Sequence, residues 1–148
     1  MFIATKRAVT PLLAVFALVA VPALAKPAIQ ATLWHNPGCQ CCAEYTHYLD
    51  QRGFDVKVVA SSDLAAVFRE HAVPGRLASC HLMTVGRYTV VGHVPVDAVQ
   101  KLLREHPAVR GISLPGMPAG SPGMSGPKQA PFVNYAFGAG KPKIYATR

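Results

Sequence analysis

Apolar residues along this chain change their spacing several times, and each change marks the end of one predicted element. Alternating apolar and polar residues or β-branched runs predict strands, whereas apolar residues three and four positions apart predict helices. The predicted strands cover residues 31–34, 54–59, 81–85 and 88–91. The predicted helices cover residues 41–52, 64–71 and 95–106. Gly53, Pro74-Gly75 and Gly86-Arg87 stand between these elements, as turn residues do.

This order predicts an α/β fold, in which a parallel β-α-β unit is followed by an antiparallel hairpin and a closing helix. Thioredoxin-like folds have this β-α-β-α-β-β-α order. Residues 111–131 are rich in Gly, Pro and Met and show little periodicity, so we expect an irregular C-terminal extension there. Residues 132–137 and 143–146 are expected to form a terminal hairpin.

The first 25 residues have the three-part layout of a secretory signal peptide. Lys6-Arg7 precede an apolar run over residues 8–21, and Ala23-Leu24-Ala25 gives a cleavage site after Ala25. The run is too short, and interrupted by Pro11, to be a good membrane span, so an uncleaved anchor is the weaker alternative. We expect residues 1–25 to be a signal peptide and residues 26–148 to be a single periplasmic domain without stable membrane insertion.

Charge and composition limit the kinds of partner and metal ion that the chain can bind. The formal net charge is +8, but the basic residues are scattered, which favours solubility over nucleic-acid binding. Export also excludes a regulator that binds nucleic acid. The seven carboxylates are dispersed, which argues against a site for a hard cation with oxygen ligands. Sulfur and imidazole are therefore the metal ligands that the chain offers.

Three of the four cysteines lie in Cys39-Gln40-Cys41-Cys42, between the first predicted strand and the first helix. The loop after the first strand of a β-α-β unit lies at the carboxyl end of the sheet, where such folds bind ligands. The positive end of the helix dipole favours thiolate over thiol. Sulfurs crowded in this way indicate either a soft-metal site or a redox centre.

Two distant segments are predicted to come to the same end of the sheet. The third strand runs antiparallel to the first, so its beginning at Cys80-His81 returns there, and the fourth strand brings His93 back to it. His81 and His93 are therefore candidate ligands, with a solvated surface position as the alternative. His35 is a weaker candidate. For Cys80 the alternative is a small buried core residue.

The spacing of Cys39 and Cys42 is Cys-x-x-Cys, which is typical of redox or metal chemistry. A third thiol at Cys41 favours scrambling over clean disulfide exchange. No proline stands directly before the third strand, where thioredoxin-type oxidoreductases carry one. Four thiolates match Cu(I) or Zn(II), or a small multinuclear copper cluster bridged by sulfur. A pair of structural disulfides remains an alternative in an oxidising compartment.

Met117 and Met124 lie in the Gly- and Pro-rich extension. Methionine is often a gap-filler. A thioether also remains a copper ligand where thiols would oxidise, which suggests a lid or relay for the ion.

Several motifs together resemble a known family, the CopG-like copper-resistance proteins, which are exported bacterial proteins containing a domain of unknown function. The similarity extends over residues 31–146. The motifs that carry it are Asn36-Pro37-Gly38-Cys39-Gln40-Cys41-Cys42, Ala78-Ser79-Cys80-His81, Gly92-His93-Val94-Pro95, Leu114-Pro115-Gly116-Met117-Pro118 and Gly120-Ser121-Pro122-Gly123-Met124. Gln40 stands where many relatives have Gly.

The resemblance implies a periplasmic thioredoxin-like protein that binds copper through Cys39, Cys41, Cys42 and Cys80 and supports copper resistance. Our leading hypothesis adds His93 or His81 as a further ligand or hydrogen-bond partner, which would allow cycling between Cu(I) and Cu(II). A copper oxidoreductase activity is left open. The alternatives are a thiol-disulfide oxidoreductase and a copper chaperone that hands its ion to an efflux or transfer protein of the periplasm.

Overall fold

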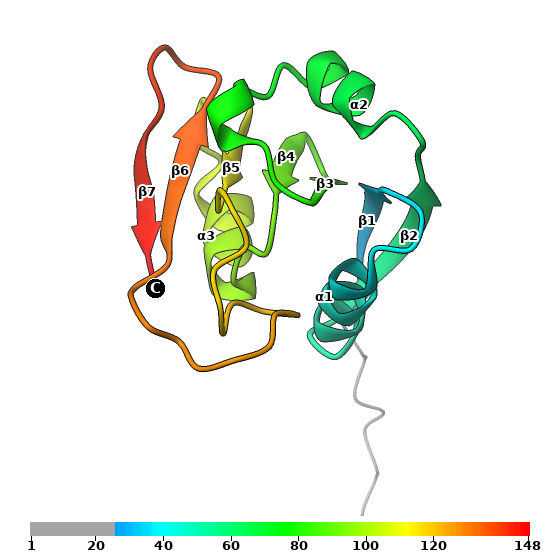
Figure 1. Cartoon of the computed structure of the whole chain (residues 1–148). Helices are drawn as coiled ribbons and strands as arrows, with labels where there is room; N and C mark the ends of the chain where they lie inside the picture. The colour runs from blue at the N-terminus through cyan, green and yellow to red at the C-terminus, as the bar shows by residue number, and fades with distance from the viewer. Residues whose placement is uncertain (1–25) are drawn as a thin grey trace, which may run out of the picture.

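The computed structural model describes residues 26–148, which Figure 1 shows in colour. The predicted signal peptide, residues 1–25, lies outside the described residues. In order, the elements are β1 (Ile29–His35), α1 (Gln40–Asp50), β2 (Phe54–Ala60), α2 (Leu64–Glu70), the 3₁₀ helix η1 (Gly75–Leu77), β3 (His81–Val85), β4 (Tyr88–Val91), α3 (Val96–Glu105), β5 (Gly111–Ser113), β6 (Val133–Phe137) and β7 (Lys143–Thr147). Among these elements no helix is long and apolar enough to cross a membrane.

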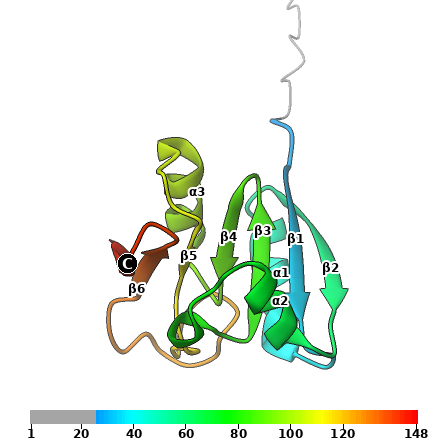
Figure 2. The same cartoon turned by 90° about the horizontal axis from the view of Figure 1, so that it is seen from above.

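The predicted β-α-β-α-β-β-α order is confirmed, and within residues 26–148 the strands form a seven-stranded sheet ordered β2-β1-β3-β4-β5-β6-β7. β1 is parallel to β2, whereas β3 is antiparallel to β1 and β4 is antiparallel to β3. Figure 2 shows these directions in the arrowheads of the four strands. Because His35 at the end of β1 pairs with His81 at the start of β3, the cysteine loop and Cys80 lie at the same end of the sheet.

The strand β5 lies inside the segment that the sequence predicts to be irregular. Its three residues pair in parallel with β4 and antiparallel with β6, so they join the terminal hairpin to the rest of the sheet. A strand this short carries no usable periodicity. Gly111 has a structural reason to be glycine, because a Cβ there would collide with the backbone carbonyl of Thr89.

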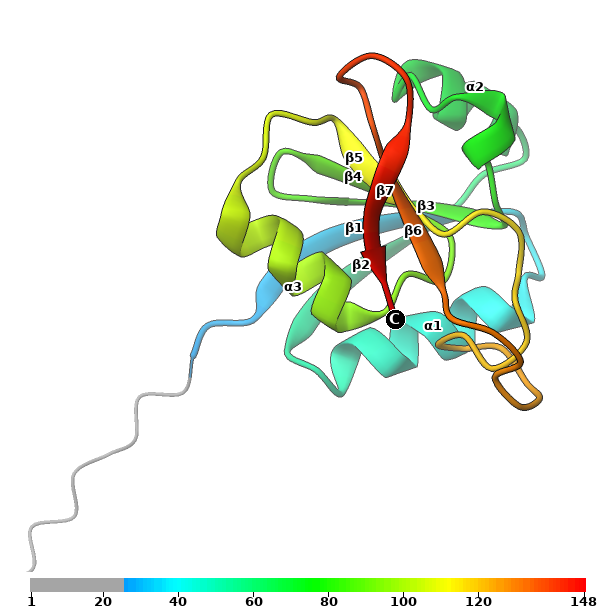
Figure 3. The same cartoon turned by 90° about the vertical axis from the view of Figure 1, so that its left-hand side faces the viewer.

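Helices α1 and α3 cover one face of the sheet, and α2 covers the other (Figure 3). On the first face, apolar side chains of both helices and of the central strands form one core, which includes Leu33, Tyr45, Leu49, Met83, Val90, Val99 and Leu102. Each fully buried aliphatic side chain of this kind contributes roughly 1.5–3 kcal/mol. On the second face Val67 and Phe68 of α2 pack against Leu82 and Val91.

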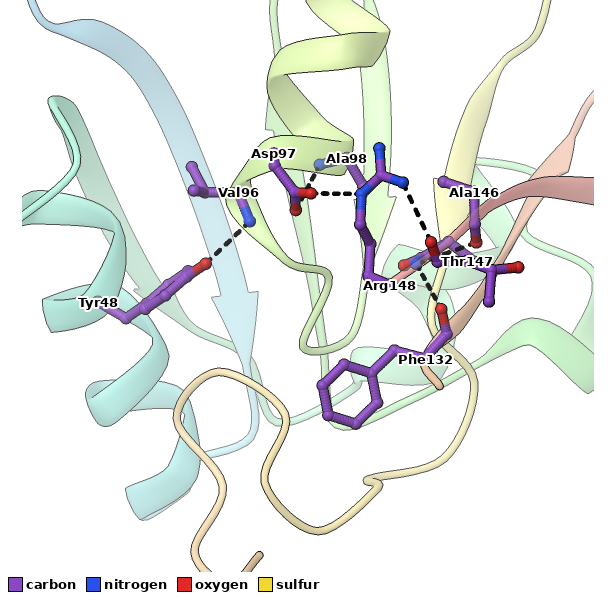
Figure 4. A network of polar contacts seen from close by, with 9 residues as sticks. Tyr48, Val96, Asp97, Ala98, Phe132, Ala146, Thr147 and Arg148 are labelled. Atoms are coloured by element: carbon purple, nitrogen blue, oxygen red, sulfur yellow. Dashed lines mark hydrogen bonds and ion pairs between the residues drawn. The ribbon is translucent and has the colours of Figure 1, made fainter. Parts of the chain in front are cut away.

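The terminal hairpin is tied to the start of α3, as Figure 4 shows. Asp97 in the first turn of α3 forms an ion pair with Arg148, and Phe132 exchanges two backbone hydrogen bonds with Arg148 at 2.7 and 3.0 Å. Tyr48 of α1 accepts a hydrogen bond from the backbone N–H of Val96 at 2.9 Å. These contacts fix the two helices that flank His93, although the exposed ion pair contributes at most about 1 kcal/mol.

Candidate metal centre

The cysteine loop is short and closes tightly between β1 and α1. The backbone N–H of Cys39 donates to the carbonyl oxygen of Asn36 at 3.2 Å, and Gly38 has a φ of 78°, which favours glycine at this turn. Cys39 is the N-cap of α1, so the helix begins at Gln40 and not at Cys41 as predicted. Cys41 is half-buried and Cys42 is buried. Successive residues of a helix point in different directions, and here Cys41 points toward the surface and Cys42 toward the core.

The structure holds a disulfide between Cys39 and Cys42, whereas Cys41 and Cys80 are free thiols. All four Sγ atoms nevertheless lie within 4.8 Å of one another. The Sγ atoms of Cys39 and Cys41 are 3.4 Å apart, and Cys42 Sγ lies 3.8 Å from the carbonyl oxygen of Cys80. The loop after β1 and the residue before β3 therefore bring all four sulfurs to one place.

Two histidines join the sulfur cluster through Cys80. Cys80 Sγ lies 3.2 Å from His81 Nδ1 and 2.9 Å from His93 Nε2, and both imidazoles are fully buried. The Nδ1 of His93 lies 2.7 Å from the carbonyl oxygen of Pro122. Because a carbonyl oxygen only accepts, Nδ1 carries the proton, and the lone pair of Nε2 faces Cys80.

The ring of Tyr45 packs against both imidazoles. Its ring centroid is 4.7 Å from that of His81 and 5.4 Å from that of His93, and the two histidine rings are 4.8 Å apart. The Tyr45 hydroxyl donates to the carbonyl oxygen of Val94 at 2.8 Å. This bond holds α1 against the connection between β4 and α3, and the ring contact with His81 joins the start of β3 to the same group.

Burial sets the protonation states at the site. Burial, followed by the charge of Cys41, raises the pKa of the Cys80 thiol to about 12. Burial, followed by the nearby His93, lowers the pKa of His81 to about 3. Burial also lowers the pKa of His93, against the raising effect of its hydrogen bond to Pro122. Near neutral pH both imidazoles are therefore neutral, the state in which a ring nitrogen can bind a metal.

The Gly- and Pro-rich extension folds back over the site and does not hang free. Ser79 Oγ donates to the carbonyl oxygen of Gly116 at 2.6 Å, and the Pro122 carbonyl oxygen accepts a hydrogen bond from His93 Nδ1. Gly123 touches α1 directly, because a Cβ there would lie 2.7 Å from the backbone nitrogen of Tyr45. Backbone atoms of the extension therefore make these contacts with the site.

The two candidate methionines lie in different surroundings. Met124 is half-buried and lines an open groove of about 760 Å³, together with Cys41 and residues of α1, namely Gln40, Glu44, His47, Tyr48 and Gln51. Met117 is 54% exposed and lies outside that groove. Met124 is thus near the exposed side of the cysteine cluster, whereas Met117 stands in solvent.

The structure brings together Cys39, Cys41, Cys42, Cys80, His81 and His93, while His35 directs its Nδ1 to the carbonyl oxygen of Asn36 at 2.6 Å. Two contacts of the site were not predicted from the sequence. They are the packing of the Tyr45 ring against both imidazoles and the hydrogen bond from His93 to the carbonyl oxygen of Pro122. Tyr45 lies on the buried face of α1 with Leu49, and apolar spacing along a helix does not indicate contacts with imidazoles. A backbone carbonyl leaves no signal in a sequence at all.

The donor set fits copper. Cu(I) prefers thiolates, and Cu(II) binds thiolate together with imidazole. The Nε2 atom of His81 is buried and has no hydrogen-bond partner among residues 26–148. A buried polar atom without a partner is costly, and such atoms are often found where a site takes a ligand. With the disulfide formed, however, Cys39 and Cys42 are not available as thiolates, so a four-thiolate site requires its reduction.

Known proteins are similar to this chain in sequence and in fold. The family model described as "Protein of unknown function, DUF411" matches residues 77–124, the stretch from η1 through Cys80, His81 and His93 to Met124. The comparison with curated proteins found no match. Two solved structures of copper resistance protein CopG, form 2 and form 1, are similar to the chain with 31% sequence identity and a TM-score of 0.76.

The similarity to these structures extends over nearly the whole described chain. It covers 82% and 83% of this chain and 98% of each matched chain. The chain therefore belongs to the CopG-like copper-resistance family, as its motifs predict.

Proposed function

We propose that this protein is a periplasmic copper-binding protein that supports copper resistance by holding Cu(I) through Cys39, Cys41, Cys42 and Cys80. The observation that carries the proposal is the mutual approach of four Sγ atoms within 4.8 Å. Thiolates at such distances can share one Cu(I) ion or bridge several. Residues 1–25 would direct export, and N-terminal sequencing of the protein from a periplasmic extract tests cleavage after Ala25.

The disulfide between Cys39 and Cys42 must open before all four sulfurs bind copper. Reduction by a dithiol adds two electrons and two protons to the disulfide and gives two thiols. Each thiol that binds Cu(I) then releases its proton. Copper capacity should therefore depend on the redox state of this pair of cysteines.

The test is anaerobic titration of the fully reduced protein with Cu(I) in competition with a Cu(I) chelator, followed by native mass spectrometry. We expect at least one tightly bound copper ion. Each Cys-to-Ser variant should weaken binding by more than the roughly 10–100-fold loss typical of second-sphere changes. His106→Asn, at the exposed C-cap of α3, is the control and should bind as tightly as the native protein. Unchanged copper stoichiometry in Cys41→Ser would refute the four-cysteine site.

A second candidate, a thiol-disulfide oxidoreductase, is favoured by one observation: Cys39 and Cys42 are joined in the structure. Against it, the residue before β3 is Cys80 and not proline. Cys41→Ser separates the two functions, because an enzyme that uses Cys39 and Cys42 should still reduce insulin disulfides in that variant. A third function, copper transfer to an efflux protein, would depend on Met124 beside Cys41.

The imidazoles beside Cys80 would also stabilise Cu(II), so one-electron cycling of the bound ion extends the proposal. In each redox cycle the bound Cu(I) would pass one electron to an external acceptor, and the resulting Cu(II) would take one electron from an external donor. Voltammetry of the copper-loaded protein tests this extension. A reversible couple that shifts in His93→Ala supports it, and a loaded protein without a couple refutes it.

A further inference from the structure

A free thiol lies against the disulfide between Cys39 and Cys42. Cys41 is that thiol, and its Sγ lies 3.4 Å from Cys39 Sγ. We propose that Cys41 attacks Cys39 Sγ and moves the disulfide from Cys42 to Cys41, where an external dithiol then reduces it. The inference concerns the metal-free protein, and only its consequence for copper capacity rests on the proposed function.

The two sulfurs are placed for this reaction. Reacting atoms held about 3–3.5 Å apart are close to an attack geometry, and groups held together on one scaffold react far faster than separate molecules do. The separation of 3.4 Å between Cys41 Sγ and Cys39 Sγ lies in this range. Cys39 is the N-cap of α1 and Cys41 lies in its first turn, so the backbone itself keeps the two sulfurs together.

The exchange conserves electrons and protons. Cys41 releases its proton to solvent and attacks as a thiolate, which is the nucleophile in disulfide exchange. The bond between Cys39 and Cys41 forms as the bond between Cys39 and Cys42 breaks, and Cys42 takes up one proton as it leaves. No oxidant or reductant is needed for this step, because one disulfide and two thiols are present before and after it.

A hydrogen-bond acceptor for the released thiol is already in place. Cys42 Sγ lies 3.8 Å from the carbonyl oxygen of Cys80. In the disulfide Cys42 has no proton to donate, whereas the released Cys42 thiol would direct its S–H to this oxygen. A thiol is a weak donor, so the contact contributes little energy, but it gives the leaving group a polar partner inside the core.

Movement of the disulfide changes which sulfur an external thiol can reach. Cys42 is only 1% exposed, so direct attack on its sulfur is blocked. Cys41 lines the open groove of about 760 Å³ between α1 and the extension, and Cys39, Cys42 and Cys80 do not line it. This volume lies within the range of small-molecule sites. A dithiol that enters the groove therefore meets Cys41 Sγ first.

Reduction then takes place in two further exchanges. One thiolate of the dithiol attacks Cys41 Sγ, forms a mixed disulfide there and releases Cys39, which takes up a proton. The second thiol of the reductant attacks its partner sulfur in the mixed disulfide and releases Cys41. The dithiol loses two electrons and two protons and becomes a disulfide, and the protein gains them as two thiols. All four cysteines are then reduced.

The experiment uses metal-free protein in the disulfide form, with dithiothreitol as the dithiol. Counts of free thiols after unfolding verify the starting state, two in the native protein and one in Cys41→Ser. Samples are quenched with acid and the remaining disulfide is measured by mass spectrometry. We expect Cys41→Ser to be reduced more slowly by about tenfold or more, because the held nucleophile is missing. Gln40→Ser, an exposed neighbour in the same groove, is the matched control and should keep the native rate. Equal rates in Cys41→Ser and the native protein would overturn the proposal.

A second measurement needs no variant. The native disulfide form is held near neutral pH without reductant, quenched with acid, unfolded and labelled at its free thiols, since exchange is slow where thiolate is scarce. The disulfide is then reduced and given a second label, and peptide fragmentation locates both. First label on Cys42 in part of the molecules supports the moved disulfide, whereas first label confined to Cys41 and Cys80 refutes it. Neither measurement involves copper, so failure here leaves the Cu(I) titration of the reduced protein as an independent test of the four-cysteine site.

Discussion

His93 donates its Nδ1 proton to the carbonyl oxygen of Pro122 at 2.7 Å, across 29 residues of sequence. This bond joins the end of the β4 segment to the extension that follows β5. It makes the extension part of the candidate metal centre, where the extension contributes the carbonyl oxygen of Pro122. The same bond determines which ring nitrogen of His93 is free to bind an ion.

The tautomer of His93 is directly measurable. In the metal-free disulfide form we expect Nδ1 to carry the proton and Nε2 to be unprotonated near neutral pH. Burial lowers the pKa of His93, so the ring should stay neutral below its usual titration range. Long-range ¹H–¹⁵N NMR spectra of the ring report both properties. A protonated Nε2, or an imidazolium at about pH 6.5, the usual pKa of histidine, would contradict the geometry.

Acid should destabilise the fold through His81. Burial lowers its pKa to about 3 from 6.5, so the unfolded chain binds the proton more tightly than the folded one. The stabilising effect is complete above pH 6.5 and is lost as the pH falls toward 3, by up to about 1.4 kcal/mol per pH unit. His93 shifts in the same direction, and the neighbouring Cys80 stays a thiol throughout this range.

Urea unfolding of metal-free protein at several pH values measures this slope. His81→Asn should flatten it by about one proton, while His47→Asn on the exposed face of α1 controls for the loss of a histidine that is not buried. An unaltered slope in His81→Asn would show that other groups cause the acid sensitivity.

Alkylation should distinguish the two free thiols. Only the thiolate reacts, and burial raises the pKa of Cys80 to about 12, so Cys80 should react slowly with iodoacetamide near neutral pH. Its rate should rise about tenfold per pH unit until the pH approaches that pKa. Cys41 lines the open groove and should be labelled first. Peptide mass spectrometry of timed samples gives both rates, and equal rates near neutral pH would contradict this assignment.

Gly123→Ala should loosen the extension. Gly123 has a φ of 80°, and a Cβ there would lie 2.7 Å from the backbone nitrogen of Tyr45, so both strain and collision oppose alanine. We expect a loss of about 1–3 kcal/mol from backbone strain, with a further loss from displacement of α1. Gly116→Ala is the matched control, because Gly116 has a φ of 72° but no atom within 4 Å of its Cβ position.

Thermal unfolding compares the two variants, and the His93 ring spectrum reports whether the Pro122 contact survives. Equal destabilisation of Gly116→Ala and Gly123→Ala would mean that contact with α1 contributes nothing beyond the backbone conformation.

The sequence predicts well which segments meet at the site, because the positions of these segments follow from the directions of the strands. A loop after β1 must lie at its carboxyl end, and antiparallel β3 and β4 return Cys80 and His93 there. The predicted meeting of Cys39, Cys80, His81 and His93 needed no side-chain detail. Their role in copper binding stays a prediction.

The strand β5, the position of the extension and the disulfide depend on contacts that leave no pattern in the sequence. The three residues of β5 are too few to show a period, and the extension is held by the carbonyl oxygens of Gly116 and Pro122. A backbone carbonyl is present at every residue, so composition cannot reveal which one accepts a bond. The disulfide likewise depends on which of three crowded sulfurs pairs with another, which spacing alone leaves open.

Cys80 is the single sulfur common to the four-cysteine set and the set with His81 and His93. A thiolate can bridge two metal ions, so a copper ion held by one set and a copper ion held by the other would share this sulfur. Substitution of this one residue would therefore disturb every ion that either set holds.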